Sequence, residues 1–362
     1  MTRMTDRDAP HLVLVGPPHH GVVRYASDLA AALAGIGAHP RVSAAADSAM
    51  ALRLIADLAR VHLHVTDRIF GSGPEDAADR VERLGRATHL SITLHDLPQP
   101  SDGRNFDRRR HAYARFMDAA AAVAVSSNYE AQLVERYLSR PAASVRVIPI
   151  GTSADATVPA ADAGASKSGT EDTALVVLIG GFVYPGKGHL EAITAAGEVV
   201  RRTAIPVPGA TAAGARRARV VAIGAPSAGH EADVDALQAH ASTLGVAFEV
   251  TGYLDDVSYR GRMAGTGIPV AAHQHVSASR SMTDWMEQGR RALVVDSPYA
   301  REMAQLRPGT MTLYDPARLA DHLEDAWRRP HLTRLAASTE LGPTLADSAR
   351  AYLAWWQETD HA

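Results

Sequence analysis

The sequence of 362 residues contains no cysteine, and this absence excludes several classes of site. Without a thiol there is no disulfide framework, no thiolate zinc site and no cysteine nucleophile. There is also no apolar run near the roughly 20 residues that a membrane-spanning helix needs. The composition, with 46% hydrophobic and 21% charged residues, is that of a globular protein long enough for two domains.

An excess of positive charge is lacking as well. Lys and Arg number 37 against 40 Asp and Glu, and the formal net charge is −3. A nucleic acid is therefore not an expected partner. The first eight residues lack the apolar core of a signal peptide, and the missing cysteines fit a reducing compartment. We expect a soluble cytoplasmic protein.

Short apolar runs alternate with alanine-rich helical segments along the chain. This alternation is typical of βαβ units, in which helices cover both faces of a parallel sheet. The predicted strands are His11–Val15, Val61–Val65, Leu90–Leu94, Ala121–Val125 and Val145–Ile148 in the first half, and Ala174–Ile179, Arg219–Ile223, Ala247–Thr251, Ile268–Ala272, Ala292–Val295 and Met311–Tyr314 in the second. The helices predicted in the first half are Val22–Gly35, Ala49–Ala59, Pro74–Arg86, Arg108–Ala119 and Glu130–Leu138.

The two halves are separated by a low-complexity segment, 153–173, whose Ala, Ser, Gly and Asp content predicts a linker or mobile loop. We therefore predict one doubly wound α/β domain over 1–152 and a second over 174–340, followed by a last helix within 341–362. Ligands of such sheets bind at the carboxyl ends of the strands. The residues that directly follow strands are therefore the candidates for a site.

A glycine-rich turn from Gly16 to Gly21 follows the first predicted strand and reads Gly-Pro-Pro-His-His-Gly. Its glycine spacing differs from the Gly-x-Gly-x-x-Gly fingerprint of dinucleotide-binding proteins, so a nicotinamide or flavin enzyme is disfavoured. Two interpretations stay open. The loop admits a sugar or phosphate group, or it is a tight turn that leaves His19 and His20 exposed.

A histidine and an aspartate, His95 and Asp96, follow the predicted strand that ends at Leu94. An imidazole there can bind a substrate hydroxyl or carry a proton. Neighbouring residues of an extended chain point to opposite sides, so His95 is the candidate for the site and Asp96 is expected to anchor the turn. For His62 and His64 no third metal ligand is evident, and we favour packed or hydrogen-bonded histidines.

An arginine-rich segment comes next. It holds five arginines and only two nearby carboxylates, namely Arg104, Arg108, Arg109, Arg110 and Arg115 against Asp102 and Asp107. Such a run is usually a solvated helix face, which is our default interpretation. Contact with an anionic acceptor or a lipid headgroup is the alternative.

The most informative segment runs from Ala174 to His189, where a buried strand leads into a glycine-rich turn and then into a helix. Backbone N–H groups at a helix N-terminus form an anion site together with the Lys187 charge, because the glycines let a ligand approach closely. The turn, Gly-Phe-Val-Tyr-Pro-Gly-Lys-Gly, nearly matches a P-loop. Gly188 stands where a P-loop has the hydroxyl that ligates Mg²⁺, so an NTPase is disfavoured.

These features together resemble the retaining glycosyltransferases of the GT-B fold, in particular those like glycosyltransferase family 4. The resemblance covers nearly the whole chain and includes the turn from Gly289 to Asp296. It implies an α/β protein of two Rossmann-like doubly wound domains that face a central cleft. It also implies a nucleotide-sugar donor, such as a UDP- or GDP-hexose, on the second domain, an acceptor mainly on the first, and no further cofactor. In this family the last helix often crosses back to the first domain.

The resemblance assigns roles to individual residues. Lys187 contacts the donor diphosphate, the early glycine loop approaches the diphosphate and sugar, and His95 lies near the transferred sugar as the catalytic candidate. Tyr253 and Leu254 line the base pocket. The full set of candidate donor-binding residues is Gly16, Gly21, Gly181, Lys187, Gly188, Tyr253, Leu254, Ser279, Arg280, Ser281 and Asp284.

The chain departs from the family pattern at a diphosphate-binding cation. Family members often carry an arginine five residues before the lysine, and this chain has Phe182 there. Lys187 alone is then left to offset the negative charge of the diphosphate, which an arginine and a lysine would normally share. Arg280 is the candidate replacement.

A second departure concerns two glutamates, separated by seven residues, that precede the last glycine turn in the family. The second glutamate falls on Asp284, which can still accept hydrogen bonds from ribose, and the first falls on Val276, which cannot. Between them, Ser279 and Ser281 offer groups that bind sugar or phosphate. The plainer interpretation is a helix start with Ser281 or Thr283 near the N-cap.

The expected activity is transfer of a hexose from a nucleoside-diphosphate sugar to a hydroxyl acceptor, with retention and without a metal. The acceptor is a glycan, a lipid-linked molecule or a small molecule. The alternative is a non-catalytic GT-B-like module or partner subunit that binds a nucleotide or glycan, which Phe182 and Val276 favour. Peripheral membrane contact, through the arginines or through Trp355 and Trp356, also stays open.

Overall fold

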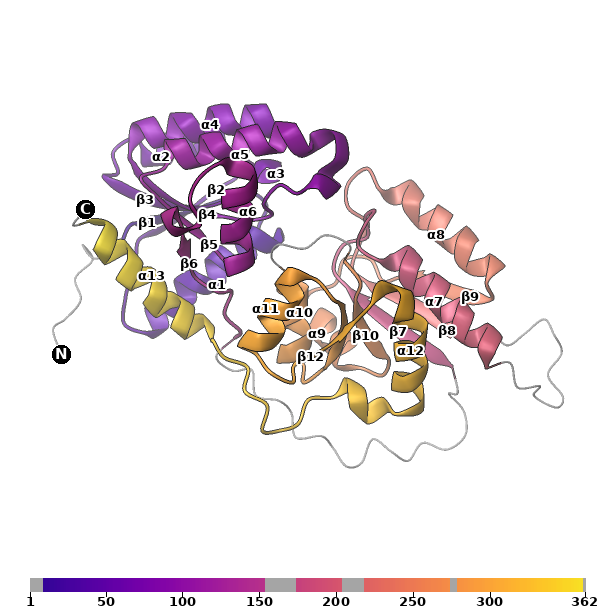
Figure 1. Cartoon of the computed structure of the whole chain (residues 1–362). Helices are drawn as coiled ribbons and strands as arrows, with labels where there is room; N and C mark the ends of the chain where they lie inside the picture. Colours follow the sequence, from indigo (N-terminus) through magenta and orange to yellow (C-terminus); the bar gives the residue numbers. More distant parts are fainter. Residues whose placement is uncertain (1–8, 154–173, 204–217, 274–278, 361–362) are drawn as a thin grey trace. The chain divides into compact units, whose positions relative to one another are not determined.

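The computed structural model describes residues 9–153, 174–203, 218–273 and 279–360. Apart from Ser153, the predicted linker 153–173 lies outside the described residues. The described chain divides into two compact units, one holding 9–153 and 342–360, the other 174–273 and 279–341. Each unit contains one six-stranded sheet whose paired strands are all parallel. Helices flank the strands of both sheets (Figure 1).

The first unit has the strand order β2-β1-β3-β4-β5-β6. Its strands are β1 (His11–Val15), β2 (Val42–Ala45), β3 (Arg60–Val65), β4 (His89–Leu94), β5 (Ala122–Val125) and β6 (Arg146–Val147). Its helices are α1 (Gly21–Gly35), α2 (Ser48–Ile55), α3 (Asp67–Phe70), α4 (Pro74–Ala87), α5 (Phe106–Ala119), α6 (Asn128–Leu138) and α13 (Leu345–Asp360), with 3-10 turns at Pro100–Asn105 and Ala142–Ser144. The direction of strand addition reverses between β1 and β3, which is the topological switch point of this sheet.

The second unit has the order β12-β11-β10-β7-β8-β9. Its strands are β7 (Leu175–Gly180), β8 (Ala218–Ile223), β9 (Val246–Val250), β10 (Ile268–Ala271), β11 (Ala292–Val295) and β12 (Met311–Tyr314). Its helices are α7 (His189–Arg202), α8 (Glu231–Thr243), α9 (Asp256–Ala264), α10 (Arg280–Glu287), α11 (Pro298–Leu306) and α12 (Leu319–Arg328), with 3-10 turns at Pro316–Arg318 and Pro330–Thr333. This is the strand order of a Rossmann fold, with its switch point between β7 and β10.

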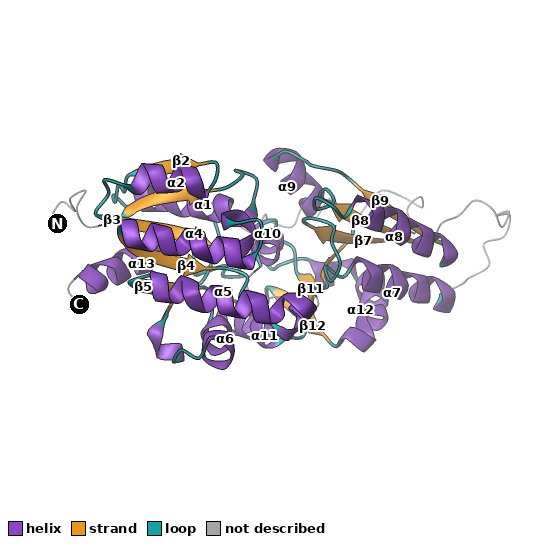
Figure 2. Ribbon diagram, turned by 90° about the horizontal axis from the view of Figure 1, so that it is seen from above, coloured by secondary structure: helices purple, strands orange, loops and turns teal. Residues whose placement is uncertain are grey.

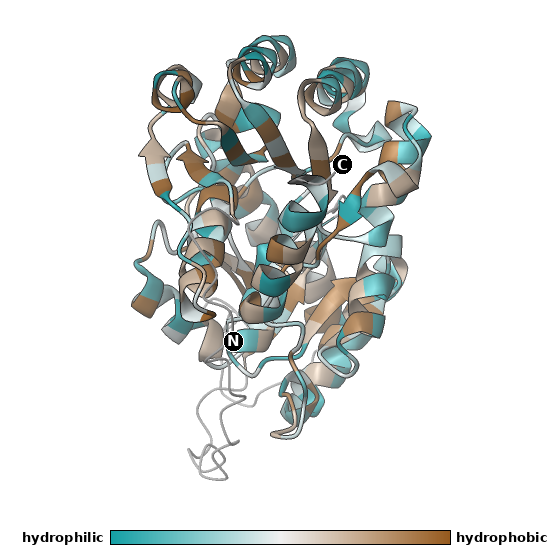
Figure 3. Ribbon diagram, turned by 90° about the vertical axis from the view of Figure 1, so that its left-hand side faces the viewer, coloured by the Kyte–Doolittle hydropathy of each residue, from teal (hydrophilic) through white to brown (hydrophobic). Residues whose placement is uncertain are grey.

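The cores follow from apolar strands that are covered on both faces. Val61, Leu63 and Val65 of β3 are fully buried, as are Ile92 and Leu94 of β4, because helices lie over both sides of the sheet. Figure 2 shows α4 and α5 lying in front of the strands of the first unit, and Figure 3 shows brown apolar strands beneath helices with teal outer faces. None of the described helices combines the length and the apolar content that crossing a bilayer requires.

Helix α13 packs on the first unit, against α1. Tyr352, Trp355 and Trp356 are buried there together with Leu29 and Leu33. The interpretation of the two tryptophans as membrane anchors is therefore wrong, since their rings are core side chains.

All eleven predicted strands are present, with ends that shift by at most two residues. The strand β2 was not predicted, because its four residues, Val-Ser-Ala-Ala, are short, weakly apolar and half exposed at the sheet edge. Helix α2 ends at Ile55, four residues before the predicted Ala59. The chain turns there, with the Leu58 N–H bonded to the Ile55 carbonyl, so that it can enter β3 at Arg60.

Candidate functional site

The switch point of the second sheet brings two loops together. Strands β7 and β10 are neighbours, with Ile268 opposite Val177 and Pro269 opposite Leu178. The chain leaves β7 through the turn that carries Lys187 and leaves β10 through Ala272 and His273. A ligand of a doubly wound sheet is expected where loops diverge in this way.

Lys187 points at the loop that follows β10. Its Nζ lies 2.5 Å from Nε2 of His273 and 3.5 Å from the hydroxyl of Ser281. Two residues later α7 begins at His189, with Gly188 as its N-cap and no side chain that caps the helix. The ammonium group and the first amides of α7 therefore belong to one turn.

Lys187 forms no ion pair in the described part of the chain. The residue is only 5% exposed, and no described carboxylate lies within ion-pair distance of Nζ. Burial lowers the pKa of Lys187 to about 8, against an opposing attraction to Asp284. Burying an uncompensated charge is costly, and an anion between Lys187 and the amides of α7 would remove that cost.

Two glycines shape this turn. Gly188 has φ of +96°, and a Cβ there would lie 2.3 Å from the carbonyl oxygen of Ala272. Gly181 has φ of +102°, and a Cβ there would lie 3.1 Å from Nζ of Lys187. Both positions therefore favour glycine because of their positive φ. At Gly188 a side chain would also clash with the β10 loop, and at Gly181 it would crowd the Lys187 ammonium.

Helix α10 contributes Ser281 to the Lys187 cluster but not Arg280. The Arg280 guanidinium lies 3.1 Å from Asp284 and 3.9 Å from Glu287, so two carboxylates of its own helix offset its charge. Asp284 also accepts a hydrogen bond from Tyr259 at 3.4 Å. Arg280, the candidate replacement for the missing arginine, is thus paired within its own helix.

A helix does start at this point, with Ser281 near its N-cap as expected. The N-cap itself is Ser279, whose hydroxyl lies 3.1 Å from that of Ser281 and makes no capping hydrogen bond. The Ser279 N–H donates to the Tyr299 hydroxyl at 3.2 Å. Val276 lies outside the described residues.

Tyr253 and Leu254 lie in the turn between β9 and α9, beyond the carboxyl end of the outermost strand on that side. Tyr253 is 71% exposed, which is unusual for a large aromatic side chain. Leu254 is half-buried beside it. An exposed ring at this end of a sheet is a surface on which a base can stack.

In the first unit the early glycine loop starts α1. Gly16 has φ of +110°, and a Cβ there would lie 3.3 Å from Ile69. Gly21 is the first residue of α1 and has open space around it. His20 is the N-cap, and its Nδ1 accepts from the Val22 N–H at 3.3 Å; its side chain is half-buried, whereas His19 is exposed.

His95 lies in a buried cluster of rings. Its Nε2 is 3.0 Å from Nδ1 of His64, and both rings contact Tyr25 edge-on. Burial, with repulsion from His20, lowers the pKa of His95 to about 3, so its imidazole is neutral. His95 is thus suited to accept or donate a hydrogen bond rather than to carry charge.

The other strand histidine, His62, is held by hydroxyl groups. Its Nδ1 lies 3.0 Å from Ser91 and its Nε2 3.1 Å from Thr93, whose hydroxyl also lies 2.9 Å from Tyr352 of α13. The interpretation of His62 and His64 as packed, hydrogen-bonded residues is confirmed. Within the described ranges no group of three or more His, Asp or Glu side chains is arranged to hold a metal.

The arginine-rich segment is not a solvated face throughout. Arg109 is buried and bonds Asp67, Asp96 and Asp102, with distances of 3.2, 2.9 and 2.7 Å. Arg108 pairs with Glu75 at 2.7 Å, and Arg115 with Asp79 and Glu82. Counting only the carboxylates close in sequence, Asp102 and Asp107, was misleading. Further carboxylates come from α4 and from the residues after β3 and β4, which are distant in sequence.

Asp96 anchors the turn after β4, as expected, but not because the chain is extended there. Its φ is +54°, in the left-handed region, and both its carbonyl and its carboxylate accept from Arg109. The alternation argument used for His95 and Asp96 therefore does not hold at Asp96.

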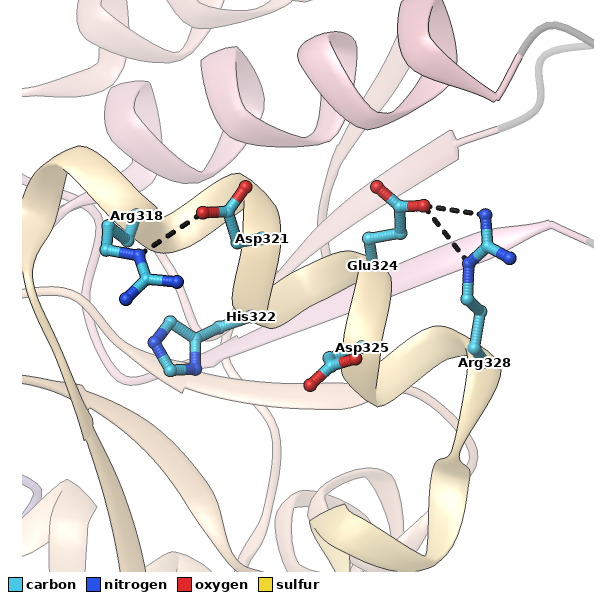
Figure 4. Close-up of a pocket in the computed structure, with 6 residues that line it drawn as sticks. All are labelled: Arg318, Asp321, His322, Glu324, Asp325 and Arg328. Carbon is cyan, nitrogen blue, oxygen red and sulfur yellow. Dashed lines mark hydrogen bonds and ion pairs between the residues drawn. The ribbon is translucent and has the colours of Figure 1, made fainter.

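A surface pocket on and beside α12 is separate from these clusters. It is lined by Arg318, Asp321, His322, Glu324, Asp325 and Arg328 (Figure 4). Arg318 bonds Asp321, and Arg328 bonds Glu324. These exposed groups offset one another, so the pocket supports no assignment.

Two Rossmann-like units, with their parallel six-stranded sheets, give this chain the GT-B fold. Solved structures with the same architecture match it over almost its full length. The sequence itself matches no protein-family model and no curated protein among those compared.

One similar structure is HepE from Anabaena in complex with UDP and glucose, which is 14% identical, with 98% of each chain covered and a TM-score of 0.64. Another is sucrose-phosphate synthase from Thermosynechococcus elongatus, which is 16% identical. The match covers 96% of the present chain and 95% of the synthase, with a TM-score of 0.65. A glycosyltransferase from Rickettsia africae is 13% identical. The match covers 96% of the present chain and 97% of the Rickettsia protein, with a TM-score of 0.63. At these identities the likeness concerns the fold.

Proposed function

We propose that this chain is a glycosyltransferase that transfers a hexose from a nucleoside-diphosphate sugar to a hydroxyl acceptor, with retention of configuration. The observation that carries the proposal is the buried Lys187, which has no carboxylate partner among the described residues and lies beside the uncapped start of α7. A diphosphate supplies the missing counter-charge, and it is also the leaving group of glycosyl transfer.

Similar structures support the nature of the ligand. HepE, one of the folds matched over nearly the whole chain, has been crystallised with UDP and with UDP-glucose. Sucrose-phosphate synthase and UDP-forming trehalose-phosphate synthase share the fold as well. The donor proposed for this chain is accordingly a nucleoside-diphosphate hexose.

The chemical step needs stabilisation of the negative charge that develops on the departing diphosphate. Lys187 and the amides of α7 would supply it, and such preorganised donors contribute several kcal/mol in a dry site. Because the protein's own cation performs this task, we propose a reaction that is independent of metal ions. Retention then follows from attack on the face from which the diphosphate departs, and we assign no enzyme nucleophile.

The remaining candidate residues take roles around that diphosphate. Tyr253 and Leu254 would hold the base and Asp284 the ribose. In the first unit, Gly16 and Gly21 would leave space for the sugar. His95, as a neutral imidazole, would hydrogen-bond a sugar hydroxyl.

Titration calorimetry with UDP, GDP and ADP, followed by donor hydrolysis and transfer assays in EDTA, tests the proposal. At least one nucleotide should bind the native protein, and Lys187→Met should weaken binding by about 2 to 3 kcal/mol, the value of a charge-assisted hydrogen bond. Arg202→Ala is the matched control, since it removes an exposed cation at the other end of α7. Equal affinity in the native and Lys187→Met proteins would contradict the proposal.

The second candidate is a non-catalytic nucleotide- or glycan-binding module. Phe182 and Val276, which stand where the resemblance expects polar groups, favour it. The same experiment separates the two functions. Nucleotide binding without donor hydrolysis or transfer to a broad set of acceptors would identify the module.

A further inference from the structure

The proposed donor raises a question of charge at Lys187. A diphosphate that links a nucleoside to a sugar carries two negative charges near neutral pH, and Lys187 supplies one positive charge. Phe182 provides none, and Arg280 already faces Asp284 and Glu287. A second positive charge close to Nζ would balance the charge of the diphosphate.

His273 is that group by position. It lies two residues after the end of β10, and its Nε2 lies 2.5 Å from Nζ of Lys187, closer than the Ser281 hydroxyl. His273 is 9% exposed and Lys187 is 5% exposed, so water screens neither strongly. In the free protein the ammonium donates to Nε2, which requires a neutral imidazole.

We propose that His273 is the second cation of the donor site, and that a nucleotide sugar binds together with one proton taken up by this imidazole. The inference rests on the proposed function. The proton comes from the buffer and returns to it when the diphosphate leaves. Uptake changes Nε2 from an acceptor into a donor, so Lys187 and His273 both donate to phosphate oxygens that lie between them.

The surroundings of His273 explain why the proton is absent before binding. Lys187, from the turn before α7, and His189, the first residue of α7, both oppose a positive charge on it, and burial acts in the same direction. These effects hold the pKa of His273 well below its ordinary value. From α10, Ser281 is neutral, and Asp284 acts on Lys187. A bound diphosphate reverses the sign of the local field and raises the pKa of His273.

His189 is the other imidazole that has to be considered. It is buried, stacks edge-on against Phe248, and neither ring nitrogen has a hydrogen-bond partner among the described residues. Its ring nitrogens form no hydrogen bond with Nζ of Lys187, whereas Nε2 of His273 lies 2.5 Å from that atom. The proton is therefore assigned to His273, and a His189 variant serves to check the assignment.

The test is titration of UDP-glucose in two non-phosphate buffers with different enthalpies of ionisation. UDP-glucose is the probe because both its phosphates are esterified and bind no proton near neutral pH. At pH 7 the native protein should take up close to one proton per ligand, and its affinity should rise as the pH falls from 7 to 6, a range in which Lys187 is already protonated. His273→Gln should abolish the uptake and weaken binding by about tenfold at pH 6.5.

Matched variants make the result specific. His331→Gln, at an exposed position, should behave as the native protein does, and His189→Asn should keep the proton uptake. Equal or tighter binding by His273→Gln would show that the side chain only occludes Lys187 and would overturn the inference. So would native binding without proton uptake, although the proposed function would survive it. Failure of UDP-, GDP- and ADP-sugars to bind the native protein would overturn both.

Discussion

Arg109 of the first unit and Lys187 of the second are both buried near the carboxyl ends of parallel strands. Arg109 forms ion pairs with Asp67, Asp96 and Asp102. Asp67 lies two residues after the end of β3, and Asp96 lies two residues after the end of β4. Lys187 of the second unit contacts a neutral imidazole, a hydroxyl and the face of the Tyr184 ring, and it forms no ion pair with a described carboxylate. The two cations occupy similar places in similar sheets. They differ in that Arg109 is balanced by carboxylates and Lys187 is not.

This difference separates a structural cation from a binding cation. A buried charge whose partners are carboxylates of the same chain holds loops in place and leaves no attraction for a ligand. Lys187 has no such carboxylate partner among the described residues, so it can still attract an anionic ligand, whose charge would balance its own. We therefore expect substitution of Arg109 to change stability, and substitution of Lys187 to change binding.

The largest effect is expected for Arg109→Met. Removal of the guanidinium leaves Asp67 and Asp102 partly buried without their cation, which should cost about 3 to 5 kcal/mol of unfolding free energy. Urea denaturation measures this cost. Arg108→Met is the control, because its pair with Glu75 is exposed and should be worth less than about 1 kcal/mol. Similar losses in both variants would remove the distinction.

Lys187→Met should leave stability at pH 7 unchanged or increased, because it removes an uncompensated buried charge. The native pKa near 8 lies below the 10.5 of the unfolded chain, so the unfolded state binds more protons between these values. Native stability should thus rise from pH 8 to 10.5 by about 3 kcal/mol relative to the variant. Urea midpoints measured across this range check the difference. A destabilised variant at pH 7 would place Lys187 among the structural cations.

Gly188→Ala sharpens the same comparison through the backbone. The new Cβ would meet the Ala272 carbonyl at 2.3 Å, so the Lys187 turn and the β10 loop must separate. We expect about 2 kcal/mol of lost stability and at least tenfold weaker nucleotide binding. Gly229→Ala has a similar positive φ but open space, and it should show only the smaller conformational cost. Calorimetry on both variants distinguishes the clash from the φ effect.

A smaller effect is expected at the histidine of the first unit. His95→Asn should slow transfer by about 10- to 100-fold and leave nucleotide affinity unchanged, since His95 is proposed to contact the sugar and not the diphosphate. Steady-state rates with the best donor, together with calorimetry on UDP, make the measurement. Loss of UDP affinity instead would mean that the first unit contributes to diphosphate binding.

Much of the fold could be predicted from the sequence, because the strands inside the two sheets are rich in Val, Leu and Ile, even where polar residues interrupt them, as His62 and His64 do in β3. Edge strand β2 has no such signal, since half of its surface faces solvent. The Lys187 turn could also be located, because its glycines are needed for local backbone geometry. The partners of buried charges could not be found in this way. They depend on which strands are neighbours: β10 beside β7 brings His273 to Lys187, and β3 beside β4 brings His64 to His95.

A structure of the chain with UDP bound tests the central claim most directly. We predict the β-phosphate within hydrogen-bond distance of Lys187 Nζ and of the first amides of α7, with the His273 ring no longer in contact with Nζ. A diphosphate bound elsewhere, with the contact between Lys187 and His273 intact, would contradict the account.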